Sequence, residues 1–175
     1  LREVARKLRM HVSYVHRAVK PLLEAGILIQ DKHKNLYLNY RNHHETLAFT
    51  EYLRRDDFLS KNKEIKLLSE EIINKLPFGY FSLLIFGSAV NTKKPKDIDL
   101  LLIIERTEDI EVAEKSLYNI YRNYNMNIHP VVLSFDSVYE MLKAREENNL
   151  VNEVLNKHII FYGAELFYRL LSRGR

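Results

Sequence analysis

The chain has 175 residues, enough for one domain or two small ones, and 46% of them are hydrophobic, which is ordinary for a globular protein. It contains no cysteine, which excludes a disulfide framework and favours a reducing, cytoplasmic setting. No apolar run is long enough to span a bilayer, so we expect no membrane partner.

Positive charge is concentrated near the N-terminus. The net charge of the chain is +4, but residues 1–40 carry eight Lys and Arg against three acidic residues, which gives +5 there and −1 over the remainder. This asymmetry assigns a polyanion-binding surface to the N-terminal segment rather than to the whole chain.

The first 41 residues predict two helices and a hairpin. Residues 2–8 predict a short helix, and residues 12–25 predict a second one because their apolar positions keep helical spacing. Gly26 is expected to end the second helix as a C′ glycine. Two short apolar runs then flank the polar turn DKHKN, so residues 27–40 predict a hairpin.

Helix, turn, helix and hairpin in this order resemble a winged helix-turn-helix domain from its second helix onward, with the first helix missing. The resemblance implies that the second helix enters the major groove of duplex DNA and that the hairpin tip meets phosphate. Two residues depart from the usual pattern: Arg9 stands where the turn normally has glycine, and Pro21 removes one N–H from the second helix. A winged domain used for protein contact or dimerisation is the alternative. The side chains expected on DNA are Ser13, Tyr14, His16, Arg17, Lys20, Lys32 and Lys34.

Residues 42–76 are dominated by helix-forming residues. Asp56-Asp57 and Ser60-Lys61-Asn62 are expected to break them into two helices. We expect the second of these, residues 65–76, to pack on the sheet of the domain that follows. Because no Gly/Ser-rich linker occurs here, we expect a rigid helical connector between a domain at 1–41 and a domain at 77–175.

Residues 77–175 predict an α+β domain, in which a mixed sheet carries helices on one side. The expected order is strand 80–86, a Gly-Ser turn, strand 98–104, helix 108–124, strand 127–133, further helix, a short strand and a closing helix.

The most informative stretch is FGSAVNTKKPKDIDLLLII, residues 86–104. Asp97 and Asp99 are two residues apart on a predicted strand, so their side chains share one face. Same-face carboxylates suit Mg²⁺, which binds phosphates through one or two protein carboxylates. Gly87 and Ser88 offer backbone N–H groups, a hydroxyl and close approach for a phosphate. The alternative is that the two aspartates merely flank a surface turn.

Strand, Gly-Ser turn, basic loop, paired aspartates and second strand resemble the nucleotidyltransferase superfamily of DNA polymerase beta type, closest to its minimal prokaryotic members, over about residues 77–170. The resemblance implies that Asp97 and Asp99 are catalytic and hold Mg²⁺ or Mn²⁺. It also implies a bound nucleoside triphosphate, with ATP expected, at Gly87 and Ser88. Three lysines lie where the triphosphate would, although a solvated turn is an equally common meaning of such a run: Lys93, Lys94 and Lys96.

Family members use a third carboxylate on the next strand, at the position that aligns with His129. Histidine adds no negative charge as neutral imidazole and favours softer ions than Mg²⁺. Glu105 lies six residues beyond Asp99, roughly 20 Å along a strand, and Asp136 lies past the His129 strand, so neither is a convincing substitute. His129 is therefore either part of the catalytic site or a partly buried histidine near an edge strand.

The leading interpretation is a DNA-binding protein whose metal-dependent nucleotidyltransferase-like domain binds NTP–Mg and transfers a nucleotidyl group to a protein or nucleic acid. By analogy with the family, the acceptor is a protein partner such as a toxin. The alternative is a catalytically impaired, nucleotidyltransferase-fold transcriptional regulator or antitoxin, in which this domain is a sensor or makes a homodimer. An RNA-modifying transferase would use the same two carboxylates.

Overall fold

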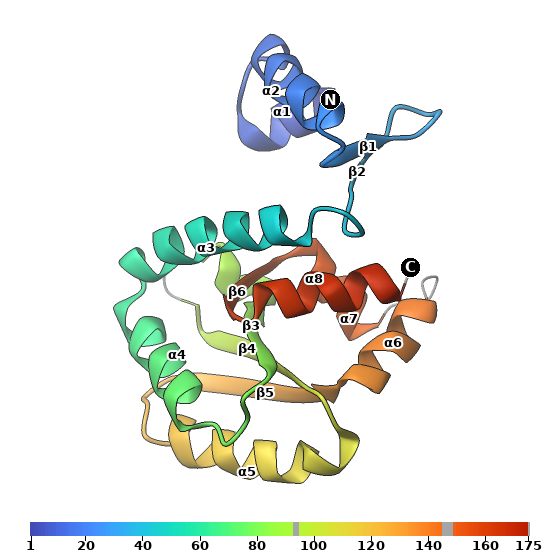
Figure 1. Cartoon of the computed structure of the whole chain (residues 1–175). Helices are drawn as coiled ribbons and strands as arrows, with labels where there is room; N and C mark the ends of the chain where they lie inside the picture. Colours follow the sequence, from blue (N-terminus) through green and yellow to red (C-terminus); the bar gives the residue numbers. More distant parts are fainter. Residues whose placement is uncertain (93–94, 145–148, 175) are drawn as a thin grey trace. The chain divides into compact units, whose positions relative to one another are not determined.

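The computed structural model describes residues 1–92, 95–144 and 149–174 (Figure 1). The chain forms two compact units, Leu1–His44 and Glu45–Arg175. Its architecture is α+β, as predicted: the described residues form eight α-helices, a two-stranded antiparallel sheet and a four-stranded mixed sheet. Over the same residues, no helix combines the length and the apolar character needed to cross a membrane.

The first unit contains two helices followed by a hairpin, as the sequence predicts. Its small core is formed by Ala5, Val15 and Val19. Gly26 has a φ of 69° and ends the second helix, which confirms its predicted role. The elements are α1 (Arg2–Leu8), α2 (Val12–Glu24), β1 (Leu28–Gln30) and β2 (Leu36–Leu38).

The turn between α1 and α2 is left-handed at Arg9, whose φ is 53°. Its neighbour Met10 donates from its main-chain N–H to the carbonyl of Ala5 at 3.0 Å, which closes the end of α1. The position at which the sequence lacks the usual glycine is thus one where glycine would be favoured. The second helix continues through Pro21 to Glu24 despite the missing N–H.

The second unit begins with two helices that the sequence assigned to a connector. The break predicted at Ser60-Lys61-Asn62 is confirmed, because one helix ends at Lys61 and the next begins at Lys63. The break predicted at Asp56-Asp57 was wrong, because the first helix continues through both residues. Both pack into the core of the sheet through Phe58, Ile65 and Ile72, among others. The elements of this unit are α3 (His44–Lys61), α4 (Lys63–Lys75), β3 (Phe81–Phe86), the 3₁₀ turn η1 (Gly87–Val90), β4 (Asp97–Ile104), the 3₁₀ turn η2 (Thr107–Asp109), α5 (Ile110–Tyr121), β5 (Asn127–Ser134), α6 (Phe135–Lys143), α7 (Leu150–Asn156), β6 (His158–Tyr162) and α8 (Ala164–Arg173).

The four-stranded sheet has the order β5-β4-β3-β6. Strand β3 runs antiparallel to both of its neighbours, and β4 pairs in parallel with β5. The sheet is therefore mixed, as predicted. Its parallel pair is joined through α5, as parallel strands require a crossover.

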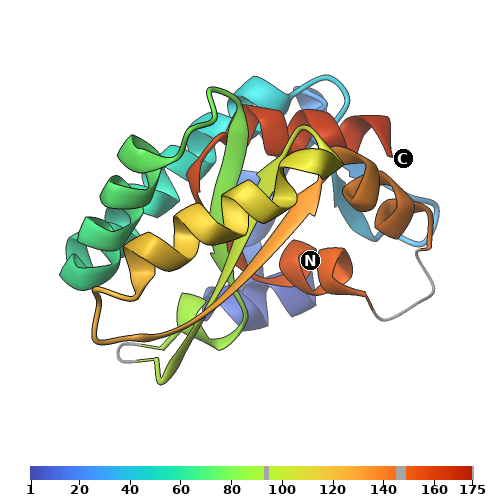
Figure 2. The same ribbon diagram turned by 90° about the horizontal axis from the view of Figure 1, so that it is seen from below.

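Helices cover both faces of this sheet, so the expectation of helices on one side was wrong. On one face, Leu83 and Leu102 pack with residues of α4 and α5 in a single cluster. Figure 2 shows α5 lying across the strands. On the other face, Ser82 donates to the carbonyl of Gly163, just before α8, at 2.7 Å. The residues of β4 are buried on both faces, which explains its nearly continuous apolar run.

Each edge of the sheet carries a feature that limits further strand pairing. Edge strand β5 contains Pro130, which has no N–H to offer. At the other edge, Arg54 and Arg55 of α3 donate to the β6 carbonyls of His158, at 2.8 Å, and Phe161, at 3.3 Å.

Candidate metal and nucleotide site

Asp97 and Asp99 lie at the start of β4 with their side chains on one face of the sheet. Both are partly buried, whereas Ile98 between them is 2% exposed and packs in the core on the opposite face. The alternation of a strand thus places the two carboxylates side by side, as the sequence predicts. The buried residues Leu100 to Ile104 fix this end of the strand in place.

The Gly87 turn lies directly against Asp99. In the β3–β4 pair, Asp99 is opposite Phe86, the residue before the turn. Gly87 has a φ of 67°, and a Cβ atom added there would lie 2.7 Å from Oδ2 of Asp99. A side chain at this position would therefore displace the carboxylate. Both the backbone conformation and the close approach require glycine.

Strand β5 supplies two polar neighbours to the aspartates. Asn127 is paired with Asp97, to whose Oδ1 it donates a hydrogen bond from its side-chain amide, and His129 is paired with Asp99. The exposed His129 thus lies beside the carboxylates, on their face of the sheet, rather than in the core. The ligand atoms of Asp97, Asp99 and His129 do not all lie within 4.8 Å of one another, so these three do not form a closed three-ligand cluster.

Two of the other residues assigned to phosphate, Ser88 and Lys96, are described by the structure. Ser88 is exposed, and its carbonyl accepts hydrogen bonds from the Asn91 N–H at 3.3 Å and the Thr92 hydroxyl at 2.9 Å. Lys96 is exposed next to Asp97. The predicted phosphate ligands Lys93 and Lys94 lie outside the described residues.

A third acidic side chain lies at this site, and the sequence analysis did not identify it. Oε1 of Glu153, an exposed residue of α7, is 3.9 Å from the position that a Gly87 Cβ would occupy. The neighbours Val151 and Val154 are buried, which turns Glu153 toward the outside of its helix. No sequence signal connects this position to Gly87, because their proximity depends on how α7 folds back onto the sheet.

A buried polar group lies beneath α7. His158 contacts the Val154 carbonyl through Nδ1 at 2.6 Å, and its Nε2 is 4.0 Å from Oε1 of Glu51. Glu51 is 3% exposed and accepts hydrogen bonds from Arg54 and from the Tyr168 hydroxyl. Burial lowers the pKa of His158, and it outweighs the opposing attraction of Glu51 and the Val154 hydrogen bond.

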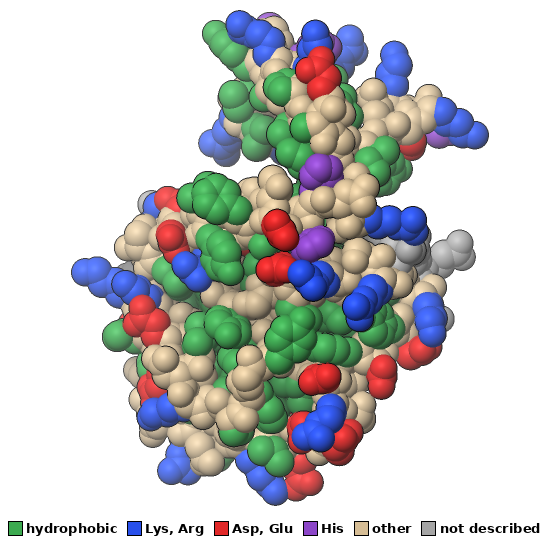
Figure 3. Space-filling view, in the orientation of Figure 1, with side chains coloured by type: hydrophobic (Ala, Val, Ile, Leu, Met, Phe, Trp, Pro, Cys, Tyr) green, Lys and Arg blue, Asp and Glu red, His purple; other side chains and the backbone are tan. Residues whose placement is uncertain are grey.

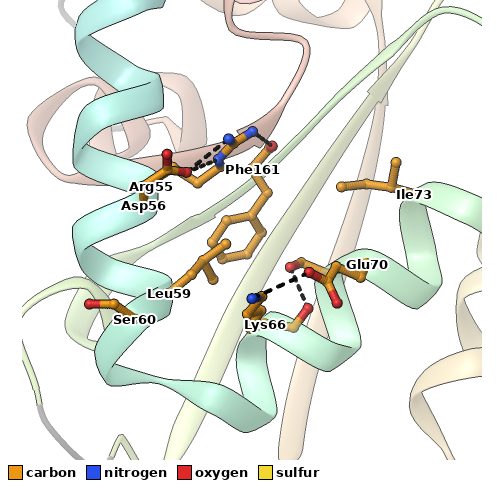
Figure 4. A pocket seen from close by; sticks show the side chains of 9 residues that line it. Arg55, Asp56, Leu59, Ser60, Lys66, Glu70, Ile73 and Phe161 are labelled. Carbon is orange, nitrogen blue, oxygen red and sulfur yellow. Dashed lines mark hydrogen bonds and ion pairs between the residues drawn. The ribbon is translucent and has the colours of Figure 1, made fainter.

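The unit also has other hollows, and one of them shares Lys96 and Asn127 with the candidate site. The one between α3 and α4 has a volume of about 470 Å³ (Figure 4). Its charged groups pair with one another: Arg55 with Asp56, and Lys66 with Glu70. Two larger cavities, of about 900 and 630 Å³, flank the loop before β4, and both are lined by Lys61 and Asn62.

The predicted DNA-contacting side chains of the first unit are all exposed. Those of α2 lie on the side away from Val15 and Val19. The guanidinium of Arg17 lies over the Tyr14 ring, 4.9 Å from its centroid, and so presents a cation and an aromatic surface together. Figure 3 shows Lys and Arg side chains (blue) around this unit.

The hairpin tip is held in shape by Asp31. Its Oδ1 accepts from the main-chain N–H groups of His33 and Asn35, each at 2.8 Å. Desolvation raises the pKa of Asp31, but hydrogen bonds from Asn35, Tyr37 and His33 outweigh it, so the pKa lies below the ordinary value. Lys32 and Lys34 are both exposed at this tip.

Compared with models of protein families, with curated proteins and with solved structures, the chain gives no match.

Proposed function

We propose that the second unit is a nucleotidyltransferase-type domain that binds a nucleoside triphosphate together with Mg²⁺ or Mn²⁺. The proposal rests chiefly on one observation: two same-face aspartates at the start of a buried strand lie against a glycine turn whose missing Cβ leaves room beside Asp99. Hard cations prefer such oxygen ligands, and they bridge protein carboxylates to phosphates.

Each residue has a distinct role in this proposal. Asp97 and Asp99 would hold the cation, which when bound neutralises charge on the phosphates. The Gly87-Ser88 turn would approach the phosphates through its backbone, and Lys96 would add positive charge beside them. Asn127 orients Asp97 through its hydrogen bond.

The reaction class is nucleotidyl transfer to a hydroxyl group. The acceptor oxygen forms a bond to the α-phosphorus, the bond from that phosphorus to the bridging oxygen breaks, and pyrophosphate leaves while the acceptor proton passes to solvent. Acceptors of two kinds fit this chemistry: a protein side chain, such as that of a toxin partner, and the 3′ end of an RNA.

The test is transfer of label from α-³²P-ATP, first with Mg²⁺ and then with Mn²⁺, to candidate protein and RNA acceptors. We expect Asp97→Ala to abolish transfer, because it removes a ligand carboxylate. Asp136→Ala, which removes an exposed acid at the start of α6, should keep it. Transfer that survives Asp97→Ala would exclude this site as its origin.

A second candidate function is a regulator or antitoxin that binds nucleotide without transferring it. The position of His129 favours it, because the residue paired with Asp99 on β5 is a histidine where nucleotidyltransferases place an acid. ATP–Mn²⁺ binding that requires Asp99, without label transfer to any acceptor, would support this candidate over the enzyme.

For the first unit we propose a winged helix-turn-helix domain that binds duplex DNA. Support comes from its charge of +5 over residues 1–40 and from the exposure of Arg17 and Lys20 on α2. Binding should weaken with salt, and Arg17→Ala should reduce the slope of log K against log salt by about 0.9 if it contacts one phosphate. Lys115→Ala, in the second unit, is the matched control. Binding that is indifferent to salt would contradict the proposal.

A further inference from the structure

Two carboxylates from distant parts of the chain converge on the space above Gly87. That space, where a Cβ would stand, lies 2.7 Å from Oδ2 of Asp99 and 3.9 Å from Oε1 of Glu153. The two oxygens are therefore separated by no more than the sum of those distances, about 6.6 Å. One carboxylate comes from β4 and the other from α7, so Gly87 lies between a strand and a helix that are far apart in the sequence.

We infer that Glu153 supplies the third acidic ligand of the metal–nucleotide site, in place of a carboxylate on β5; this inference rests on the proposed nucleotide function. Oxygen ligands of one Mg²⁺ lie at most about 4.2 Å apart, since each metal–oxygen distance is about 2.1 Å. The ligand atoms of Asp97, Asp99 and Glu153 do not all lie within 4.8 Å of one another, so the exposed Glu153 side chain would close the site by rotating toward Asp99. Glu153 thereby provides the negative charge that His129 lacks.

The placement of Glu153 is supported by the residues that anchor α7. His158 holds the carbonyl of Val154, the residue after Glu153, at 2.6 Å. The same His158 is paired in the sheet with Phe86, the residue before Gly87. One histidine thus fixes both the glycine turn and the end of the helix that carries the glutamate. At the other end of α7, the Asn149 side chain accepts from the Asn152 N–H at 3.0 Å.

The other acids considered from the sequence do not reach this space. Glu105 follows the last residue of β4, at the end of the strand opposite to Asp97. Asp136 lies in the first turn of α6, after β5 has ended. Glu153 is the acid that the structure brings beside both Gly87 and Asp99.

The inference is tested by metal binding rather than by activity. Mn²⁺, alone and with ATP, is titrated into the protein while the electron paramagnetic resonance signal of free Mn²⁺ is followed. Glu153→Gln should weaken binding about tenfold or more, in the range expected for a lost metal-site group. Glu105→Gln is the matched control: it makes the same substitution at an exposed glutamate of the same unit, and it should bind like the unmodified chain.

A double variant tests whether Glu153 replaces the carboxylate that is missing from β5 at position 129. Adding His129→Asp to Glu153→Gln should restore Mn²⁺ binding, because it returns a carboxylate to the strand position beside Asp99. A double variant that still binds weakly would overturn the role assigned to Glu153.

The remaining outcomes separate this inference from the proposed function. If Asp99→Asn loses Mn²⁺–ATP and Glu153→Gln binds normally, the inference is wrong and the proposed function stands. If the unmodified chain does not bind Mn²⁺–ATP at all, both are wrong.

Discussion

The two units use their apolar residues in different ways. The first has three buried core residues, Ala5, Val15 and Val19, and eight exposed large apolar side chains within 44 residues. Among its described residues, the second exposes the same number over a chain about three times as long, and both faces of its central strand β4 are buried from Leu100 to Ile104. The first unit is thus close to the minimum core for a fold, whereas the second has enough buried surface to hold two carboxylates side by side.

The largest expected effect is a cavity in the core of the second unit. Leu102 is 0% exposed at the centre of β4, and Leu102→Ala should lower the free energy of unfolding of this unit by about 2–5 kcal/mol. Hydrogen exchange resolved by peptide should show lost protection in residues 45–175 and unchanged protection in α1 and α2. Equal loss in both units would mean that they do not unfold separately.

The site itself is most sensitive at Gly87. Gly87→Ala forces a side chain into a backbone with φ of 67° and against Asp99, so it should cost about 1–3 kcal/mol of stability and weaken Mn²⁺–ATP binding. Gly79→Ala is the matched control, because a Cβ at Gly79 meets nothing within 4 Å. Normal binding by Gly87→Ala would show that Asp99 does not need its present position.

A smaller effect should follow from pH through His158. Because burial lowers its pKa below the ordinary value of about 6.5, the folded chain binds this proton less readily than the unfolded chain. The contribution of His158 to the free energy of unfolding is therefore complete above pH 6.5. It is lost as the pH falls from 6.5 toward the folded-state pKa of His158, by at most about 1.4 kcal/mol per pH unit. Urea unfolding at pH 7.5 and 5.5 measures this loss.

Replacing His158 should reduce the dependence of the free energy of unfolding on pH. His158→Gln is expected to lose less stability between pH 7.5 and 5.5 than the unmodified chain. If this variant keeps the full dependence of stability on pH, another group is responsible for it.

The smallest expected effect concerns the first unit. Arg9→Gly relieves the left-handed conformation of Arg9, which costs an L-residue about 1–2 kcal/mol, but it also increases the entropy of the unfolded chain. We expect a net gain in unfolding free energy of roughly 0.5–1 kcal/mol, measured by amide exchange in α1 and α2. Arg6→Gly removes the same charge inside α1 and should instead destabilise the unit.

Local patterns in the sequence predicted most of the elements and the two carboxylates. The alternation of Asp97, Ile98 and Asp99 is sufficient to place both acids on one face, and Gly26 is sufficient to end α2. These predictions succeeded because they depend on residues that are neighbours along the chain.

Features that depend on distant contacts were missed. The packing of residues 65–76 on the sheet was predicted and is confirmed by Ile72, but apolar spacing does not say that Phe58 of α3 also enters this core. Glu51 has the sequence context of an exposed helical residue, yet it is 3% exposed, and its Oε1 accepts hydrogen bonds from Tyr168 and Arg54. Glu153 could not be predicted as a site residue, because it lies beside Gly87 only through the tertiary placement of α7.

The two protected edges of the second unit's sheet bear on self-association. Pro130 deprives β5 of an N–H, and the guanidinium groups of Arg54 and Arg55 occupy carbonyls of β6. An incoming strand would find an interrupted ladder on either side, which disfavours intermolecular strand addition and the fibrous aggregates it seeds. A symmetric pair formed through the second unit would therefore use its helices or loops instead.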